Sequence, residues 1–281
     1  MNTRAIATET LSKEKVAREA RVNGSAPVWY FGYGSNMRAS VMASRSITPQ
    51  NMLVVRVQSH VLTFDVFGFP YTEPSMASIA ERSQVHKGTT VLCHNELTDL
   101  PPVHGIAYLI SREDYVRLVI SEGGGVAYRE VELEAEIIHD DPMLAGKKLV
   151  VLSLEAKYPF RPNATPSMRY LGLLINGAAE QKLPEDYQEY LKLLKSYRTP
   201  ESNWTRFGGY VFLSFWKPIL NKIVKYMKAN TDSNGHCEQW IEKLIVYGYA
   251  AMWTTHNKLH CHLWGRGDGR DDGTGYPILA T

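Results

Sequence analysis

The chain contains 281 residues, 44% of them hydrophobic, and its formal net charge is only +2. This length suffices for one large domain or for one domain with an extension, whereas the small and scattered charge excludes the basic stripe typical of nucleic-acid-binding proteins. Three cysteines at irregular spacing, Cys93, Cys237 and Cys261, favour reduced thiols and a cytoplasmic protein over a disulfide-linked secreted one.

The first 27 residues are expected to form a flexible tail. Residues 1–27 are charged and rich in alanine, a composition that favours a frayed or weakly helical segment. They lack the succession of basic, apolar and small residues that marks a signal peptide, so the sequence gives no indication of secretion.

A buried strand followed by a glycine turn is predicted directly after this tail. Residues 28–31 are β-branched or aromatic, as buried strands prefer, and Gly32 and Gly34 permit a positive φ or the close approach of another backbone. Ser35 or Asn36 can cap a following helix. Successive backbone N–H groups in such a turn can hold a carboxylate or phosphate, although a strand that ends in glycines is by itself more often structural.

Alternation of apolar and polar residues predicts several further strands. The strand over residues 128–138 alternates four glutamates with apolar residues, which we interpret as a solvated face and not as a catalytic cluster. Helices are predicted over residues 169–176 and 185–197, the second opened by Pro184. So many strands with few intervening helices favour a closed or nearly closed sheet, which avoids exposed edges. The remaining strand candidates are residues 52–57, 59–64, 105–110 and 149–154.

Glu122 is the strongest candidate for a catalytic side chain. It follows an amphipathic helix predicted over residues 113–121, and three consecutive glycines at 123–125 end that helix. Such a glycine run indicates close approach by a ligand or by another backbone. The alternative is that Glu122 is an ordinary solvated glutamate, but a carboxylate held between a rigid helix and a bendable loop is well placed for chemistry.

Residues 201–264 are predicted to form a helical, aromatic-rich extension. Helical patterns cover residues 219–227 and 238–253. The apolar segment 208–220 is too short, and too interrupted by a lysine and a proline, to span a bilayer. We expect the extension to pack on the preceding domain, where it would roof a pocket for a bulky substrate or form a dimer face. The aromatic residues that crowd its beginning are Trp204, Phe207, Tyr210, Phe212, Phe215 and Trp216.

A cluster of three histidines and one cysteine occupies residues 256–262. His256 and His260 are four residues apart, a spacing that zinc sites use. No second group of ligands accompanies them, so we predict no metal site. Residues 265–281 are expected to be a second flexible tail, and the Arg-Gly-Asp sequence within it is interpreted as chance.

Several motifs resemble, in the expected order, those of the γ-glutamyl cyclotransferase-like proteins. Residues 33–36 are similar to the signature loop of that family, and residues 121–123 with Tyr128 resemble its Glu-Gly turn and downstream tyrosine. The resemblance covers about residues 28–195. Its other stretches are a small-residue strand at 74–79, a strand at 103–110 and a helical end at 165–187.

The resemblance implies a fold and a division of the chain. The family has a small mixed β-barrel surrounded by helices, so the expected fold class is α+β. Residues 28–200 would form the catalytic domain, and residues 201–264 the extension packed on it.

The resemblance also implies a reaction that needs no cofactor or metal. The α-amine of a γ-glutamyl compound attacks its own γ-carbonyl, and 5-oxoproline and an amine are released. Because an α-amine has a pKa near 8, it must first lose a proton, and Glu122 is the implied catalytic base. Burial of Glu122 against apolar walls would bring its basicity closer to that of the amine.

Six further residues are implied to bind the substrate. The backbone of the signature loop would hold the substrate carboxylate or the developing oxyanion. Two tyrosines would donate from their hydroxyls or form walls of the pocket. These residues are Tyr33, Gly34, Ser35 and Asn36 of the loop, with Tyr128 and Tyr170.

The longer chain and residues 38–45 resemble the cyclotransferase-like enzymes of fungal secondary metabolism, including those associated with gliotoxin-type sulfur-bridged diketopiperazines. The implied substrate is then a glutathione conjugate whose γ-glutamyl groups are trimmed. Where many relatives carry a tyrosine, residues 153–156 read Ser-Leu-Glu-Ala. The outer part of the pocket, and with it the leaving group, therefore stays undetermined.

Two alternatives remain beside this hypothesis. The first is a housekeeping cyclotransferase that acts on γ-glutamyl amino acids, γ-glutamylamines or glutathione. The second is an inactive binding protein of the same fold, against which the presence of Glu122 argues. In each case the expected partner is a small molecule, with no nucleic acid and no membrane span, and the protein would be a monomer or a homodimer.

Overall fold

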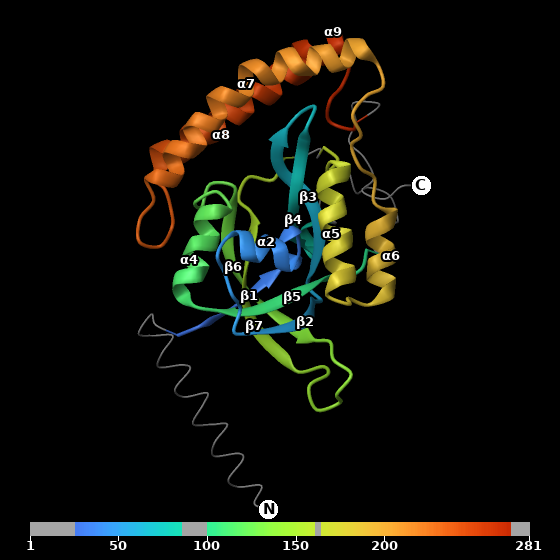
Figure 1. Cartoon of the computed structure of the whole chain (residues 1–281), viewed down its shortest axis with the longest axis vertical. Coiled ribbons are helices and arrows are strands. Elements are labelled where there is room, and N and C mark those ends of the chain that lie inside the picture. The colour runs from blue at the N-terminus through green and yellow to red at the C-terminus, as the bar shows by residue number, and fades with distance from the viewer. Residues whose placement is uncertain (1–25, 86–99, 161–163, 271–281) are drawn as a thin grey trace, which may run out of the picture.

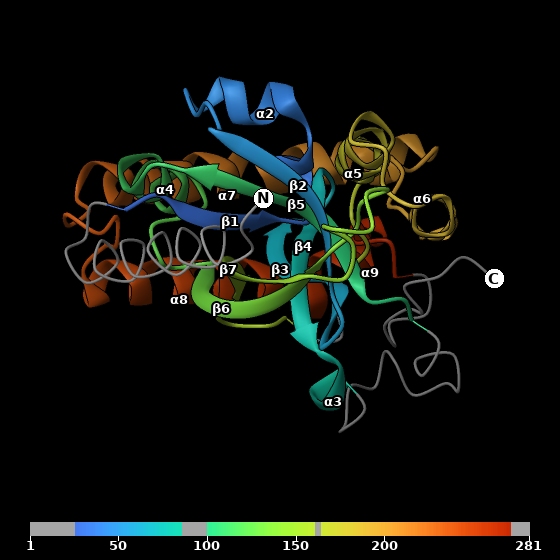
Figure 2. The same cartoon turned by 90° about the horizontal axis from the view of Figure 1, so that it is seen from below.

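Five strands of the computed structural model close into a barrel. The structure describes residues 26–85, 100–160 and 164–270, so Cys93 and most of both predicted tails lie outside the described residues. Strand β1 is parallel to β7 and the other pairs are antiparallel, so the sheet is mixed and closed, as the sequence predicted (Figure 1; Figure 2). In barrel order the strands are β1 (Val28–Gly32), β5 (Val103–Ile110), β2 (Asn51–Val57), β6 (Tyr128–Ile137) and β7 (Lys148–Ala156).

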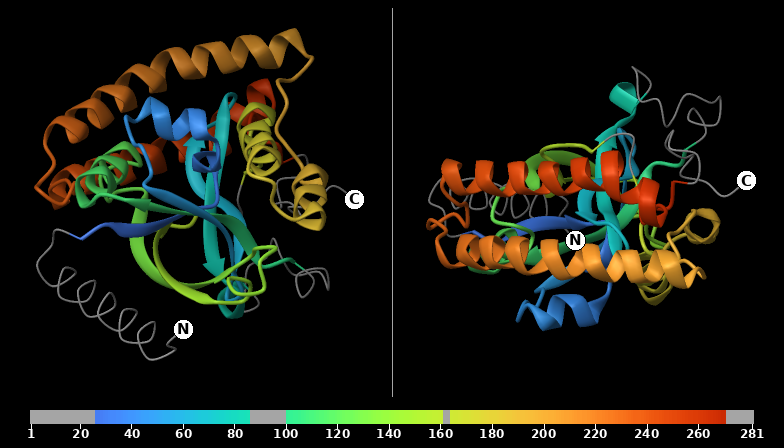
Figure 3. Two further views of the ribbon diagram at one scale, coloured as in Figure 1. Left: turned by 60° about the horizontal axis from the view of Figure 1, so that its bottom comes forward. Right: turned by 90° about the horizontal axis from the view of Figure 1, so that it is seen from above.

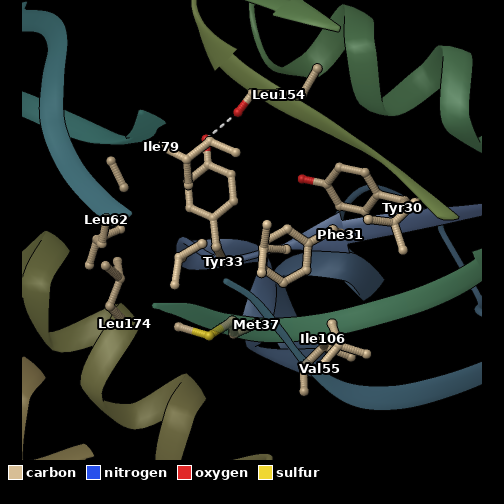
Figure 4. Close-up of a cluster of buried hydrophobic side chains, with 14 of the residues drawn as sticks. Tyr30, Phe31, Tyr33, Met37, Val55, Leu62, Ile79, Ile106, Leu154 and Leu174 are labelled. Carbon is tan, nitrogen blue, oxygen red and sulfur yellow. Dashed lines mark hydrogen bonds between the residues drawn. The ribbon is translucent and has the colours of Figure 1, made fainter. Parts of the chain in front are cut away.

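Apolar residues at alternate positions of these strands fill the barrel. Phe31, Val55 and Ile106 are fully buried and lie together in Figure 4. Alternation places every second side chain of a strand on the same face, so a period of two in the sequence becomes one continuous core. Gly105 lets β1 and β5 approach closely, because a Cβ there would lie 2.3 Å from the Gly32 carbonyl oxygen.

A separate hairpin packs against β7. Strands β3 (His60–Phe69) and β4 (Glu73–Glu81) form a two-stranded sheet, with an irregularity in register between Thr63 and Val66. The Ala156 backbone N–H donates to the Ser78 hydroxyl at 2.8 Å and ties the hairpin to β7. The turn of the hairpin reaches toward the C-terminal helices (Figure 1).

Two of the helices around the barrel, α4 and α5, begin after a serine cap. Ser111 accepts a hydrogen bond from the Asp114 N–H at 3.0 Å, and Ser167 accepts one from the Tyr170 N–H at 3.0 Å. The helix predicted over 185–197 is shorter than expected, because the Tyr197 N–H donates to the Pro166 carbonyl and the chain turns extended at Leu194. The elements are η1 (Ser35–Met37), α2 (Ala39–Ser44), α3 (Arg82–Val85), α4 (Arg112–Ser121), α5 (Met168–Glu180) and α6 (Glu185–Leu193).

The extension is helical and lies across one end of the barrel. Its two long helices, α7 (Asn203–Ala229) and α8 (Gln239–Thr255), run side by side in the right view of Figure 3. They are followed by η4 (His256–His260) and α9 (Cys261–Trp264). Within the described ranges, no helix combines the length and the hydrophobicity that a membrane span requires.

The extension closes against the glycines that follow α4. Residues 123–125 all have positive φ, and the Cys237 N–H donates to the Gly124 carbonyl at 3.1 Å. A Cβ on Gly124 would lie 2.6 Å from the Met227 sulfur, and one on Gly125 would lie 2.5 Å from the His236 ring. The sequence left open whether a ligand or another backbone approaches these glycines. In the structure, another part of the chain approaches them.

Replacing Gly124 by alanine is expected to lower the free energy of unfolding by about 2–4 kcal/mol, because φ is +55° and the new Cβ would collide with Met227. Gly146→Ala is the matched control, since its φ is +76° but no atom lies within 4 Å of the new Cβ. Chemical denaturation of both variants gives the comparison. Equal losses of stability would mean that the contact with α7 contributes nothing.

Residues 265–270 are packed into the protein, so the predicted tail does not begin at residue 265. The Asp268 side chain is fully buried and pairs with Arg266 at 2.7 Å and with Arg270 at 2.6 Å. The Tyr71 N–H in the β3–β4 turn donates to the Gly267 carbonyl. The arginine and aspartate of the Arg-Gly-Asp sequence thus belong to an ionic cluster around the buried Asp268.

Two of the histidines at residues 256–262, His256 and His260, have structural partners. Burial lowers the pKa of His256 to about 4, so its ring is neutral at pH 7. Its Nε2 accepts from the Gly267 N–H at 3.3 Å, and its Nδ1 contacts Asn257. His260 lies 2.9 Å from the Gly208 carbonyl and so links η4 to α7.

Candidate functional site

One small cavity collects all the site residues that the sequence singled out. It lies where β1, α4, β6 and α5 begin or end, and its volume is only about 20 Å³. The structure adds three residues that were not predicted, namely Tyr30, Ala77 and Leu154. The predicted residues in its wall are Tyr33, Gly34, Ser35, Asn36, Glu122, Tyr128 and Tyr170.

The ends of the elements bring these residues together from distant parts of the chain. Strand β1 ends at Gly32, and the signature loop turns into η1. Glu122 is the C-terminal cap of α4, whereas Tyr170 lies in the first turn of α5. Gly34 has φ −105°, so it does not use the positive φ that glycine permits. A Cβ there would lie 3.4 Å from the Tyr170 hydroxyl.

The Glu122 carboxylate is held through one of its two oxygens. Oε1 accepts from the Asn36 amide at 2.9 Å and from the Arg45 guanidinium. Among the described residues, none donates a recorded hydrogen bond to Oε2. A cation and an amide therefore fix the orientation of Glu122 while its second oxygen stays available.

Asn36 orients Glu122 and also offers an acceptor of its own. Its amide Nδ2 donates to the Tyr30 hydroxyl at 2.8 Å as well as to Glu122, and its Oδ1 is buried with no hydrogen-bond partner in the described chain. No side chain caps η1 or α2, so Asn36 is not the helix cap that the sequence suggested. A buried acceptor without a partner is costly unless a ligand supplies a donor.

The tyrosines of the cavity differ in what their hydroxyls can still do. The Tyr33 hydroxyl donates to the Leu154 carbonyl (Figure 4), and the Tyr128 hydroxyl donates to the Ala77 carbonyl at 2.9 Å. Tyr170 instead accepts from the Ala77 N–H at 3.2 Å, so its own proton remains available, as does that of Tyr30. Burial raises the pKa of all four hydroxyls above the ordinary value, which keeps them protonated.

Backbone donors line the same cavity. The hydrogen bonds recorded within the loop are donated by the N–H groups of Met37, to Gly34, and of Arg38, to Ser35. No recorded bond within the described ranges is donated by the N–H groups of residues 34–36. These N–H groups and the Tyr170 hydroxyl are suited to bind a negative oxygen.

Arg45 is the polar residue of this site that sequence reasoning missed. It follows the short helix α2, and its guanidinium is brought to Glu122 by the fold. Glu122 holds the pKa of Arg45 above the ordinary value although burial opposes the charge. No local pattern joins two residues 77 positions apart, so only the tertiary structure reveals the pair.

Arg45→Ala is expected to lower kcat for the release of 5-oxoproline, the activity that the resemblance implies. Glu122 would then be held by Asn36 alone, and a misplacement of about 1 Å can cost roughly 100-fold in rate. Arg45→Lys should recover part of this loss, because an ammonium can bond to one oxygen. Arg117→Ala on α4, which removes a pair with Asp114 outside the cavity, is the control. An unchanged kcat in Arg45→Ala would contradict a positioning role.

Comparison with known proteins gives consistent matches. The γ-glutamyl cyclotransferase gliK of Aspergillus fumigatus is 46% identical over 245 residues, which are 86% of this chain and 90% of that protein. The γ-glutamyl cyclotransferase aclK of Aspergillus oryzae is 35% identical over 249 residues, again 86% of this chain and 90% of the relative. Residues 202–263 match the family model described as the AclK C-terminal domain. A solved structure described as a γ-glutamyl cyclotransferase covers 79% of this chain and 99% of its own at 19% identity, with a TM-score of 0.47.

Proposed function

Because this chain belongs to the γ-glutamyl cyclotransferase family, we propose that it releases 5-oxoproline from a γ-glutamyl compound by intramolecular attack of the α-amine on the γ-carbonyl. The observation that carries the proposal is the division of the cavity into acceptors and donors. Glu122 Oε2 and Asn36 Oδ1 can accept, whereas the loop N–H groups and Tyr170 can donate. An α-amino acid end, with one ammonium and one carboxylate, complements this arrangement.

The acceptor side binds the ammonium. Three N–H bonds of an α-ammonium can meet Glu122 Oε2 and Asn36 Oδ1, and the orphaned amide oxygen then gains the donor that it lacks. The nearby guanidinium of Arg45 is a like charge for the ammonium, and a like charge favours the neutral amine. Glu122 and Asn36 therefore bind the ammonium, whereas Arg45 favours the neutral amine that the reaction needs.

The donor side binds the negative oxygens. The N–H groups of residues 34–36 would take the substrate carboxylate or the oxyanion that forms at the γ-carbonyl. The Tyr170 hydroxyl remains a donor because its burial keeps it protonated. Tyr33 and Tyr128, whose protons are used by backbone carbonyls, act as rigid walls that fold the glutamyl chain.

The proton balance follows from these groups. Glu122 takes a proton from the ammonium, and the neutral amine attacks the γ-carbonyl carbon to form the new ring C–N bond. The ring nitrogen then loses a second proton, and the bond between the γ-carbon and the leaving nitrogen breaks. The leaving nitrogen gains two protons in total and departs as an ammonium, with Glu122 as the carrier.

For the substrate, we propose a glutathione conjugate of fungal secondary metabolism, of the gliotoxin type. The proposal is supported by the 46% identity to gliK over most of both chains and by the match of the extension to the AclK C-terminal domain. Such a small-molecule substrate would be met in the cytoplasm. The second candidate is housekeeping turnover of glutathione or γ-glutamyl amino acids, which the Glu122 cavity would accept equally well.

Mass-spectrometric detection of 5-oxoproline tests both the proposed reaction and the proposed substrate. Purified protein would be incubated in parallel with glutathione, a γ-glutamyl dipeptide, and a glutathione S-conjugate. Release from the conjugate in preference to the others is expected. Equal release from all three would favour housekeeping turnover, and release from none of them would contradict the proposed activity on these substrates.

A further inference from the structure

A second cavity lies between the catalytic domain and α8. Its volume is about 370 Å³, which is within the usual range for small-molecule sites. Five aromatic rings line it, and four of them contact each other in two pairs. The ring centroids are 4.7 Å apart for Phe67 and Tyr249 and 4.8 Å apart for Phe160 and Trp253. The fifth ring is that of Tyr158. We call this space the aromatic cavity.

The chemistry of the aromatic cavity favours a neutral ring system. Its walls are mainly apolar. Besides the hydroxyls of Tyr158 and Tyr249, its polar groups are Thr254, Asn257 and Lys258, at the C-terminal end of α8 and just after it. No carboxylate lines it. Aromatic walls of this kind bind flat apolar groups by stacking and by removing them from water.

The aromatic cavity and the Glu122 cavity lie on one face of the β3–β4 hairpin. Phe67 pairs directly with Ser75 across the hairpin, so their side chains share a face. Ala77, which lines the Glu122 cavity, is two residues further along β4 and therefore on that same face. At a rise of about 3.3 Å per residue, Ala77 lies roughly 7 Å along β4 from the residue that pairs with Phe67.

An S-substituted γ-glutamyl substrate carries its substituent over a comparable distance from the scissile bond. In a glutathione conjugate, five covalent bonds join the scissile γ-carbonyl carbon to the first atom of the sulfur substituent, a span of roughly 6–7 Å. We propose that the aromatic cavity binds the apolar, ring-bearing sulfur substituent of the substrate while the Glu122 cavity holds its γ-glutamyl end. This inference rests on the proposed function and names what the extension contributes to it, because α8 supplies Tyr249 and Trp253.

Adjacent alanines of α8 allow a matched test. Ala250 lines the aromatic cavity, and Ala251 does not although it is also exposed. In Ala250→Trp the new ring would fill the aromatic cavity. Thr254 lies one helical turn further along α8 and also lines the cavity, so Thr254→Trp is a second variant that blocks it. Ala251→Trp adds the same ring to the outer surface and serves as the control.

The probes are S-benzylglutathione and S-methylglutathione, which differ only in the ring. The KM of the wild type should be about tenfold lower for the benzyl compound, because burial of one ring increases affinity by about that factor. Ala250→Trp and Thr254→Trp should remove this difference and leave KM for S-methylglutathione unchanged, and Ala251→Trp should change neither. Equal KM values for both probes in the wild type would overturn the proposal, as would a block that affects both probes alike.

Binding without turnover separates this proposal from the proposed activity. Isothermal titration of S-benzylglutathione into Glu122→Gln, with and without Ala250→Trp, measures occupancy of the aromatic cavity directly. Weaker binding in the double variant supports the aromatic cavity even if no protein releases 5-oxoproline. Equal binding in the two proteins contradicts it even if the wild type is active.

Discussion

Replacing Glu122 by glutamine is expected to lower kcat for 5-oxoproline release by about 10²–10⁴-fold, the usual contribution of a positioned acid–base group. The amide oxygen of glutamine can still accept from Asn36 and Arg45, which now bond to Oε1, so the geometry of the cavity is kept. What is lost is the second oxygen that can take a proton from the substrate ammonium. The fall should therefore appear in kcat more than in KM.

The matched control is Glu132→Gln, an exposed glutamate on β6 outside the cavity. Steady-state rates, with 5-oxoproline measured by mass spectrometry, would be compared for the wild type and both variants, and thermal unfolding would verify that each is folded. If Glu122→Gln turned over at the rate of the wild type, Glu122 would not be the proton carrier, and the donors of the signature loop would have to account for the rate.

The second large effect is expected for stability and concerns Asp268. Asp268→Asn should lower the free energy of unfolding by about 3 kcal/mol, because Asp268 is buried between Arg266 and Arg270 and both guanidinium groups bond to its Oδ2. Without the carboxylate, two positive charges would face each other in a poorly hydrated place. Chemical denaturation measures the difference, and Asp140→Asn, an exposed aspartate, is the control.

The contribution of Asp268 should depend on pH in a defined direction. Burial opposes the charge, but Arg266 and Arg270 outweigh it and hold the pKa of the carboxyl below its usual range. A lowered pKa means that the stabilisation is fully present above the unfolded pKa of about 3.9 and is lost as the pH falls through the folded pKa. The stability gap between wild type and Asp268→Asn should therefore be constant near neutral pH and narrow in acid. A gap that widened in acid would contradict this ion-pair account.

Much of the architecture could be predicted because it depends on local patterns. Alternation of apolar residues indicated which segments are strands, as in residues 52–57 and 105–110. The end of α6 could not be predicted in this way. Its last residues look helical, but Tyr197 bonds to Pro166 from another part of the chain.

In the candidate site, too, some features could be predicted from the sequence and others could not. The residues that gather in one cavity could be named from the sequence. Glu122 was indicated by the glycines after it, and the signature loop, Tyr128 and Tyr170 by resemblance to the family. The tertiary structure alone decided how they act. It placed Arg45 on Glu122, left Asn36 Oδ1 without a donor and gave the protons of Tyr33 and Tyr128 to backbone carbonyls.

The helices of the extension could be predicted from the sequence, but the way they pack on the rest of the chain could not. Its helices follow from their own apolar periodicity, whereas their docking depends on what the glycines after Glu122 and the hairpin turn present to them. Residues 265–270 look like a tail because glycines and charges dominate them, yet Asp268 is buried between two arginines. Periodicity and motif spacing are local properties that can be read from the sequence. Hydrogen-bond partners and ion pairs depend on distances across the fold, and these distances are defined only by the packed chain.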